Sequence, residues 1–249
     1  LEAALRSRPV ALLGEVHDNV AQHRLRAAAL RRFVESGARP ALLMEQFDRE
    51  HQSAIDRVLA DPAATPDDVI AAGAPQPQGW SWPLYRPYIA LALEYRLPIV
   101  AANVSRSDAR RVTKAGLAAL GFDAHVPADI AEAHARAIVD GHCGLLDAAQ
   151  ARTLVDAQVA RDQFMARAIE AHAGRRVVLL AGDGHVRRDV GVPRWLSGQT
   201  RARSISIGLL EDGDDAATSY DVALATAAQQ RPDPCDAMRG AAADGAGRP

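Results

Sequence analysis

The sequence predicts an α/β fold in which a mainly parallel central sheet is flanked by helices. Short apolar runs alternate along the chain with longer stretches whose apolar residues recur every three or four positions. The first four runs are continuously apolar, as expected for parallel strands that helices cover on both faces. With 249 residues, of which 48% are hydrophobic, the chain is long enough to bury such a core without a disulfide or a structural metal.

Six strands and six helices are expected. The strands are predicted at residues 9–13, 41–44, 98–102, 176–181, 204–208 and 220–224. The helices are predicted at residues 19–36, 49–60, 83–96, 105–119, 127–140 and 147–173. The last three helices follow one another without a strand between them, which predicts a helical region inserted between the third and fourth strands.

We expect one domain over residues 1–228. Residues 61–82 are rich in Pro, Gly, Gln and Trp and are expected to cross over the sheet edge rather than to link two domains. From residue 229 the composition shifts to Gly, Ala, Asp and Pro without periodicity. Residues 229–249 are therefore expected to be a disordered C-terminal tail.

Composition excludes several classes of protein. The net charge is −2, from 29 basic and 31 acidic residues, which gives no overall electrostatic case for binding nucleic acid or an anionic membrane. Lys114 is the only lysine, and so strong a preference for arginine, with abundant alanine, reflects genomic base composition more simply than function. Two cysteines, Cys143 and Cys235, are too few for a disulfide framework. No apolar run approaches the ~20 residues that span a bilayer.

Polar side chains follow four of the predicted strands at the point where each strand ends. They are Glu15 and His17 after the first strand, Glu45 after the second, Asn103 after the third, and Asp183 and His185 after the fourth. Because ligands of open parallel sheets bind beyond the carboxyl ends of the strands, these side chains are expected to converge on one functional site. Helix capping by Asp18 or Asn19 and a tight turn at the nearby glycines are the structural alternatives.

Two chemistries suit this group of residues. Glu15, His17, Glu45 and His185 offer the oxygen and nitrogen ligands of a divalent metal ion, and Asp183 or a spare Glu would then activate water. Alternatively, the imidazoles border a larger ligand. The sequence has no GxSxG nucleophile elbow, no P-loop, no GxGxxG after the first strand and no CxxCH haem attachment motif.

Other candidates have an equally simple structural interpretation. His23 lies near the start of the first predicted helix, facing either the same cleft or solvent. Five of the eleven aromatic residues fall within sixteen positions and form either a small core or an apolar wall for a flat ligand, with a tyrosine as an iron ligand: Trp80, Trp82, Tyr85, Tyr88 and Tyr95. His142 and Cys143 form either a buried turn or a pair of metal ligands. Arg161 and Asp162 form either a surface ion pair or a contact to an anionic group.

These motifs resemble the ChaN-like haem-binding uptake family. The resemblance rests on the segments at 14–19 with His23, 44–48, 88–103, 141–144, 157–166, 182–186 and 191–193, and spans about residues 8–224. It implies an α/β fold shared with the Tiki metalloproteases and erythromycin esterases. It also implies a bacterial envelope protein, often a lipoprotein, so that membrane attachment is expected only through an N-terminal lipid anchor, if there is one.

The resemblance implies haem as the cofactor, held with a tyrosine ligand at a dimer contact, so that a homodimer is expected. The residues expected near haem are His17, His23, Tyr85, Tyr88, Asn103 and His185, with Arg86 near the propionates. No nucleic acid partner is expected. Relatives with hydrolase activity carry the same Glu and His elements, so the alternative is a hydrolase in which Glu15, His17, Glu45 and His185 form the catalytic or metal set.

Overall fold

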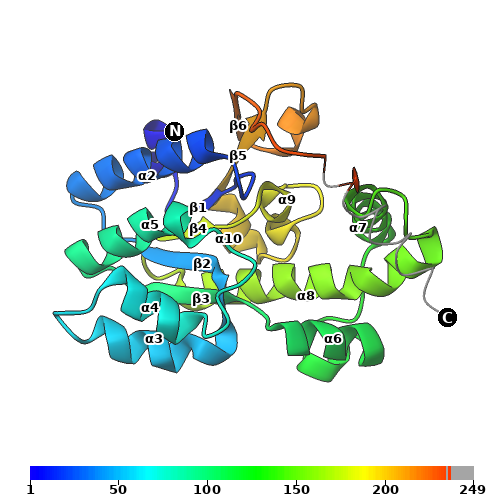
Figure 1. Ribbon diagram of the computed structural model, residues 1–249, viewed down its shortest axis with the longest axis horizontal. Helices are drawn as coiled ribbons and strands as arrows, with labels where there is room; N and C mark the ends of the chain where they lie inside the picture. The colour runs from blue at the N-terminus through cyan, green and yellow to red at the C-terminus, as the bar shows by residue number, and fades with distance from the viewer. Residues whose placement is uncertain (234, 237–249) are drawn as a thin grey trace. The chain divides into compact units, whose positions relative to one another are not determined.

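The central feature is a parallel sheet of six strands in the order β3-β2-β4-β1-β5-β6 (Figure 1). The computed structural model describes residues 1–233, 235 and 236. The strands are β1 Val10–Leu13, β2 Ala41–Asp48, β3 Ile99–Asn103, β4 Val177–Leu180, β5 Ser204–Glu211 and β6 Val222–Thr226. All five neighbouring pairs are parallel, which confirms the predicted fold class.

Strand β2 is longer than predicted. Its apolar run ends at Met44, but the strand continues to Asp48, and its pairing with β3 shifts register between Met44 and Asp48. Glu45 therefore lies within the strand and not after it. The sequence pattern stops at the first charged residue, whereas hydrogen bonding to the neighbouring strand does not.

The six predicted helices are present, with ends that differ from the prediction by one to four residues. The α-helices are α1 Glu2–Ser7, α2 Val20–Glu35, α3 Gln52–Leu59, α4 Pro66–Gly73, α5 Trp82–Tyr95, α6 Arg106–Ala115, α7 Ala128–Gly141, α8 Ala148–His172, α9 Asp183–Val186 and α10 Gly198–Ala202. The helix expected at 105–119 ends at Ala115, because Gly116 has a φ of +77° and a 3₁₀ turn follows. No helix in the described part of the chain combines the length and hydrophobicity that crossing a bilayer requires.

The expected excursion over 61–82 contains a helix, α4, that the composition concealed. Thr65 caps it: its side chain accepts a hydrogen bond from the Asp68 backbone, and the Asp68 side chain accepts one from the Thr65 backbone. Pro66 occupies the first helical position, where its missing N–H costs nothing. The capping box could have predicted this helix from the sequence, but the surrounding Pro, Gly and Gln residues favoured an irregular segment.

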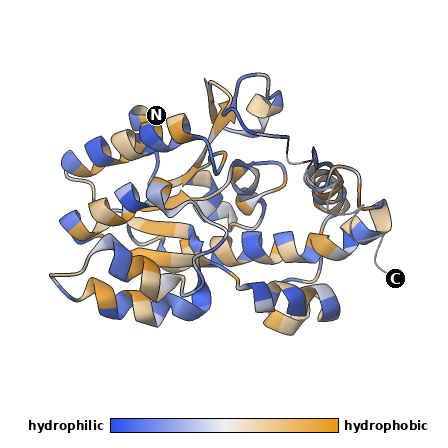
Figure 2. Cartoon of the chain, in the orientation of Figure 1, coloured by the Kyte–Doolittle hydropathy of each residue, from blue (hydrophilic) through white to orange (hydrophobic). Residues whose placement is uncertain are grey.

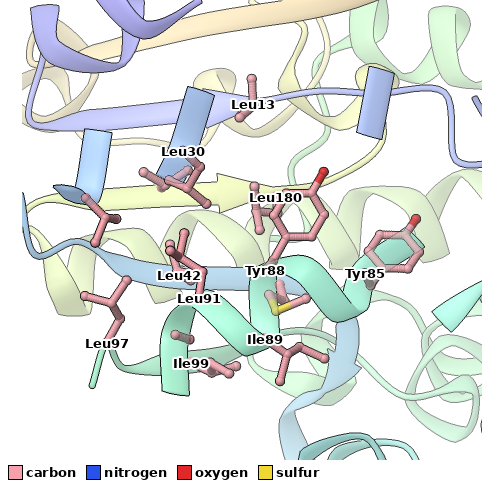
Figure 3. Packing of buried hydrophobic residues seen from close by; sticks show 14 of the residues in the cluster. Leu13, Leu30, Leu42, Tyr85, Tyr88, Ile89, Leu91, Leu97, Ile99 and Leu180 are labelled. Carbon is pink, nitrogen blue, oxygen red and sulfur yellow. The ribbon is translucent and has the colours of Figure 1, made fainter. Parts of the chain in front are cut away.

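Alternate strand residues pack against helices on opposite faces of the sheet. On one face Leu13, Leu42 and Leu180 pack with residues of α2 and α5, including Leu30 and Tyr88 (Figure 3). On the other face the remaining strand residues pack with the second half of α8 and with the segment that follows β4. The strands are accordingly hydrophobic along their length in Figure 2, as a sheet covered on both sides requires.

The described residues group into two compact units, and the single domain expected over 1–228 stays a prediction. The first comprises residues 1–105 and 161–228 and contains the whole sheet. The second comprises residues 106–160 and the described residues from Gln229 onward, so that helix α8 begins in the second unit and ends in the first. The tail predicted from residue 229 lies mostly outside the described residues.

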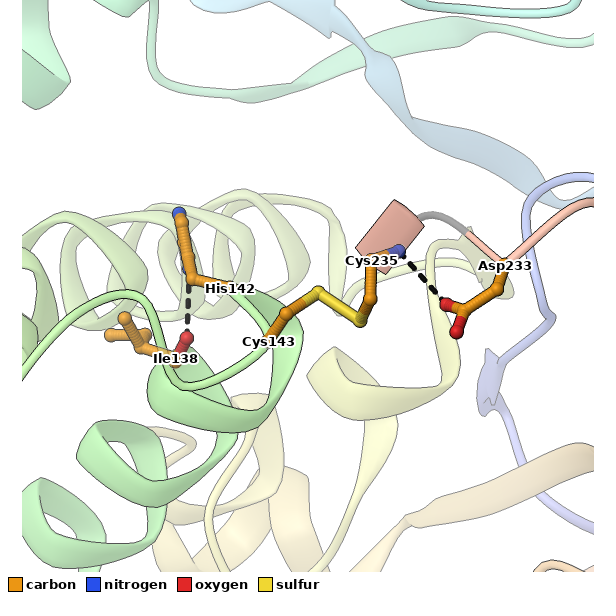
Figure 4. Close-up of a disulfide and its surroundings, with 5 residues drawn as sticks. All are labelled: Ile138, His142, Cys143, Asp233 and Cys235. Carbon is orange, nitrogen blue, oxygen red and sulfur yellow. Dashed lines mark hydrogen bonds between the residues drawn. A yellow bond between two sulfur atoms is a disulfide. The ribbon is translucent and has the colours of Figure 1, made fainter. Parts of the chain in front are cut away.

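The two cysteines form one disulfide within the second unit, a pairing that the sequence did not predict. Cys143, in the loop between α7 and α8, is bonded to Cys235, 92 positions later in the chain (Figure 4). The adjacent His142 directs its Nδ1 to the Ile138 carbonyl oxygen at 2.7 Å. Residues 142–143 are therefore a covalently fixed turn and not a metal pair.

One glycine in α4 permits a close contact that a methyl group would destroy. A Cβ at Gly73 would lie 2.5 Å from the ring of Phe47 and 2.9 Å from Ile55. We expect Gly73→Ala to lower the free energy of unfolding by about 1–3 kcal/mol, because overpacking displaces the ring. Urea unfolding followed by circular dichroism measures this.

Gly198→Ala at the start of α10, where no atom lies within 4 Å, is the matched control and should change stability by less than about 0.5 kcal/mol. Equal effects of the two substitutions would contradict the packing argument.

Candidate functional site

The carboxyl ends of β1 and β4 lie side by side in the middle of the sheet, and the chain leaves them in opposite directions. After β1 it passes to β2 on one side, and after β4 it passes to β5 on the other. Such a reversal opens a crevice at the carboxyl edge of a parallel sheet. The two connections are joined there by a hydrogen bond from the Asp183 N–H to the Glu15 carbonyl oxygen at 2.9 Å.

The carboxylate of Glu15 is the centre of the site and is fully buried. It forms an ion pair with Arg26 of α2, whose guanidinium is also fully buried and donates to the Leu13 carbonyl oxygen. Asn19 caps α2 by accepting a hydrogen bond from the Gln22 backbone, which fixes the start of the helix and brings His23 and Arg26 to the same side of it. Arg26 was not predicted from the sequence, although a cation among the buried positions of α2 was the available signal.

Two tyrosines of α5 complete the surroundings of Glu15 and Arg26. The Tyr85 hydroxyl donates to Glu15 Oε1 at 2.9 Å, and the guanidinium of Arg26 lies over the Tyr88 ring. Both tyrosines have no exposed surface, and burial raises the pKa of each hydroxyl (Figure 3). Their hydroxyls therefore serve the buried network in this conformation and do not reach a ligand outside it.

His23 is buried and belongs to the same network. Its Nε2 lies 3.1 Å from the His17 carbonyl oxygen and 3.3 Å from Glu15 Oε2. Because a carbonyl oxygen can only accept, this nitrogen carries the proton. Burial holds the pKa of His23 below its usual value, so the ring is neutral at pH 7. His23 supports the loop after β1 and is not placed to contact a ligand.

His185 is held between two carboxylates on the β4 side of the site. Its Nδ1 lies 2.6 Å from Asp162 Oδ1 of α8, and its Nε2 lies 3.4 Å from Glu45 Oε1 of β2. Burial by itself would lower the pKa of His185, but the two carboxylates raise it to about 10. Burial would likewise raise the pKa of Glu45, but His185 and the Gly182 N–H lower it to about 2. Asp162, expected in a surface ion pair, is instead fully buried.

His17 is the most exposed histidine of the site, with 48% of its side chain accessible. Its Nδ1 lies 3.0 Å from Glu15 Oε1, and its ring meets the edge of Trp80 at 4.9 Å between centroids. The ring lies against the backbone of Gly182, where an added Cβ would come within 2.8 Å of His17 Cε1. Among the described residues, no group hydrogen-bonds to Nε2. This nitrogen is the one basic atom of the site left for a ligand.

The remaining predicted residues lie at the margins of this network. Asn103 ends β3 and donates to the Glu45 carbonyl oxygen. Asp183 begins α9, and burial raises the pKa of its carboxyl. Arg86 is exposed and forms an ion pair with Asp67 of α4. Each is near a strand end or a helix of the sheet unit, but none contacts His17 or His185 through a hydrogen bond.

The predicted metal set does not fit a metal ion. Within the described residues, no three or more His, Cys, Asp or Glu side chains are arranged so as to hold one. The physical reason is that each carboxylate already has a cation: Glu15 has Arg26, and Glu45 has His185. A protonated His185 also has no lone pair to offer. The convergence of Glu15, His17, Glu45 and His185 is therefore better described as two histidine–carboxylate pairs.

The charge on His185 should appear in the pH dependence of stability. A histidine with a pKa raised from 6.5 to about 10 stabilises the folded state fully below pH 6.5 and loses that contribution as the pH rises through 10. We expect the free energy of unfolding to fall more steeply between pH 6.5 and 10 in the wild type than in His185→Gln. Urea unfolding at several pH values in this range measures it. Parallel profiles for the two proteins would mean that His185 is neutral in the folded state.

The fold is similar to those of several solved structures. ChaN of Campylobacter jejuni, described with cofacial haem binding, has a TM-score of 0.76 and 18% identity over 89% of this chain and 89% of that chain. The erythromycin esterase EreC has a TM-score of 0.51 and 13% identity, over 85% of this chain and 72% of that one. The type III effector HopBA1 has a TM-score of 0.50 and 12% identity, over 91% of each chain. Identities this low show a shared fold.

Sequence comparison identifies the family. Among curated protein sequences, none is significantly similar to this chain. The model of the family described as haem-binding uptake, Tiki superfamily, ChaN matches residues 1–196. That span includes β1 to β4 and every residue of the site from Glu15 to His185. The chain belongs to the ChaN family of haem-binding uptake proteins in the Tiki superfamily.

Proposed function

We propose that this chain binds haem at the carboxyl edge of the sheet, that His17 is its iron ligand, and that the protein serves haem or iron uptake. Membership of a haem-binding family supports haem as the ligand. The observation that carries the location is the state of His17: it is half exposed, it is oriented by a buried carboxylate, and its Nε2 has no hydrogen-bond partner among the described residues.

The other residues expected near iron are less suited to ligate it. Tyr85 and Tyr88 are fully buried, and a raised pKa disfavours the phenolate that iron would need. Both ring nitrogens of His185 face carboxylates. Its positive charge is already taken up by these two carboxylates, so neither ring nitrogen is available to iron in this structure. His17 is thus the residue whose chemistry fits an iron ligand.

The surroundings of His17 suit this role. A hydrogen bond from Nδ1 to a carboxylate fixes the tautomer with the lone pair on Nε2 and orients the ring, which favours a metal–ligand bond. Trp80, whose edge contacts the imidazole, supplies an aromatic surface beside it. When bound, haem would supply the redox-active iron, and the protein's own contribution would be orientation and charge.

We further propose that the protein works in the bacterial cell envelope. The disulfide between Cys143 and Cys235 supports this, because disulfides persist in oxidising compartments and are rare in the cytosol. The expected lipid anchor and homodimer belong to the same proposal. Sedimentation velocity of the protein with and without haemin would show whether ligand binding changes its association state.

Haemin titration of the purified protein, followed by the Soret band with metal content measured on the same sample, tests the proposal. We expect a saturable shift with one haem per chain, and at least a ten-fold weaker affinity in His17→Ala, because the iron–nitrogen bond is lost. Tyr85→Phe and Tyr88→Phe should bind as the wild type does, since their hydroxyls stay inside the buried network.

His125→Ala is the matched control for this titration, because His125 is an exposed histidine of the second unit. It should leave the affinity unchanged. If His125→Ala weakens binding as much as His17→Ala does, haemin is being captured by surface imidazoles. If either tyrosine substitution removes binding, the iron ligand is a tyrosine and the site must open to expose it.

A second candidate function is hydrolysis without a metal, and the pairing of His17 with Glu15 favours it. A neutral imidazole held by a buried carboxylate can take a proton from water while the water oxygen attacks a carbonyl carbon, and can then return that proton to the leaving group. This replaces the metal-dependent hydrolase expected from the sequence.

A screen of activated esters in the presence of a chelator separates the two candidates. A hydrolase of this kind should keep its activity with the chelator and lose at least 100-fold in kcat in His17→Ala. The Tyr88→Phe protein controls for indirect effects of altering the network. No turnover above that of His17→Ala in any substrate class would leave haem binding as the function of the site.

A further inference from the structure

Helix α6 carries a dense block of positive charge outside the site described above. Four of its ten residues are basic and exposed: Arg106, Arg110, Arg111 and Lys114. With about 100° per residue, these four fall within an arc of roughly 140° on the helix. Ala109 and Val112, which are buried, lie on the opposite side. The single acidic residue of the helix, Asp108, lies outside the basic arc. One face of α6 therefore carries four cations and no acidic residue, with Ser107 as the uncharged residue within the same arc.

The cations of this face differ from those of a comparable segment in having no acidic partners. Helix α2 is as rich in arginine, but Arg26, Arg31 and Arg32 each form an ion pair with a glutamate. Within the residues that the structure describes, no carboxylate pairs with any of the four cations of α6. Their charge is thus directed outward and is not neutralised within the fold.

We propose that the basic face of α6 is a docking surface for an anionic membrane, whose lipid phosphates the four cations contact. Arginine binds phosphate oxygens through two parallel hydrogen bonds, which suits a surface dense in phosphates. No aromatic side chain lies on α6, so the stacking contacts typical of single-stranded nucleic acid binding are not available there. A straight helix of about 15 Å with one basic face matches a flat anionic surface.

The overall charge of −2 does not oppose this interaction. At physiological ionic strength, charges farther away than about 8 Å are largely screened. The binding of a docked helix therefore depends on the charges of that helix and not on the net charge of the protein. Each Arg or Lys near an anionic bilayer increases partitioning about five-fold. Four of them give weak, reversible binding by themselves, enough to orient a protein that is held at the membrane by another attachment.

Vesicle co-sedimentation of the full chain tests the proposal. We expect binding to phosphatidylcholine vesicles that contain 30% phosphatidylglycerol, no binding to phosphatidylcholine alone, and loss of binding at 0.5 M salt. The variant Arg106→Gln/Arg110→Gln/Arg111→Gln/Lys114→Gln should partition at least 100-fold less. Glutamine keeps helix propensity similar, so α6 should remain folded, as circular dichroism checks.

The matched control removes four exposed arginines from other helices and their ends: Arg24→Gln/Arg57→Gln/Arg201→Gln/Arg203→Gln. It makes the same change in net charge and should lose at most a few-fold in partitioning. Equal loss in both variants would overturn the proposal, because binding would then follow total charge. Failure of the wild type to bind anionic vesicles at low salt would overturn it as well, and so would tighter binding of an RNA oligomer through the same four residues.

Discussion

The ion pair between Glu15 and Arg26 is the interaction on which the rest of the site depends. Both groups have lost all contact with water, and an isolated charge at that depth is unstable by several kcal/mol. Pairing makes burial tolerable only while the geometry is maintained, so the loop after β1 and helix α2 must hold a fixed relation to each other. The hydrogen bond from Arg26 to the Leu13 carbonyl oxygen ties this relation to the end of the central strand. The polar network is thereby part of the core and not an addition to its surface.

This arrangement gives the two histidines of the edge opposite properties. Glu15 is neutralised by Arg26, so its hydrogen bond to His17 orients the ring without adding an uncompensated charge. His185 lies between two carboxylates, Glu45 and Asp162, which raise its pKa and stabilise its protonated form. The exposed imidazole of His17 therefore offers a nitrogen to a ligand, whereas the charge of His185 is taken up by its two carboxylates. Haem iron requires such a nitrogen ligand, and hydrolysis requires such a base.

The sequence was sufficient to predict the sheet and the strand ends that carry Glu15, His17, Asp183 and His185, because parallel strands bring such residues to one edge. It could not predict what these side chains would contact. Arg26 and Asp162 lie in helices where most charged residues face solvent, and their burial depends on the packing of α2 and α8 against the sheet. The sequence left open whether the tyrosines pack in the core or reach a ligand. Tertiary contacts set the rotation of α5 about its axis and so decide which side chains of the helix are buried. The disulfide joins cysteines 92 positions apart, a pairing that spacing alone does not indicate.

The two functions proposed for the site compete for one atom. An iron ligand and a general base both require the lone pair on His17 Nε2, since His23 is buried and His185 is protonated. A molecule whose His17 holds haem therefore has no base with which to activate water, and a hydrolase of this design would be inhibited by haem at equal stoichiometry. The buried network does not supply a substitute, because the Nε2 of His23 carries a proton and its Nδ1 is buried against the Tyr88 hydroxyl at 3.4 Å. A single protein of this structure thus performs one of these reactions at a time, and the choice between them lies with the ligand that reaches His17.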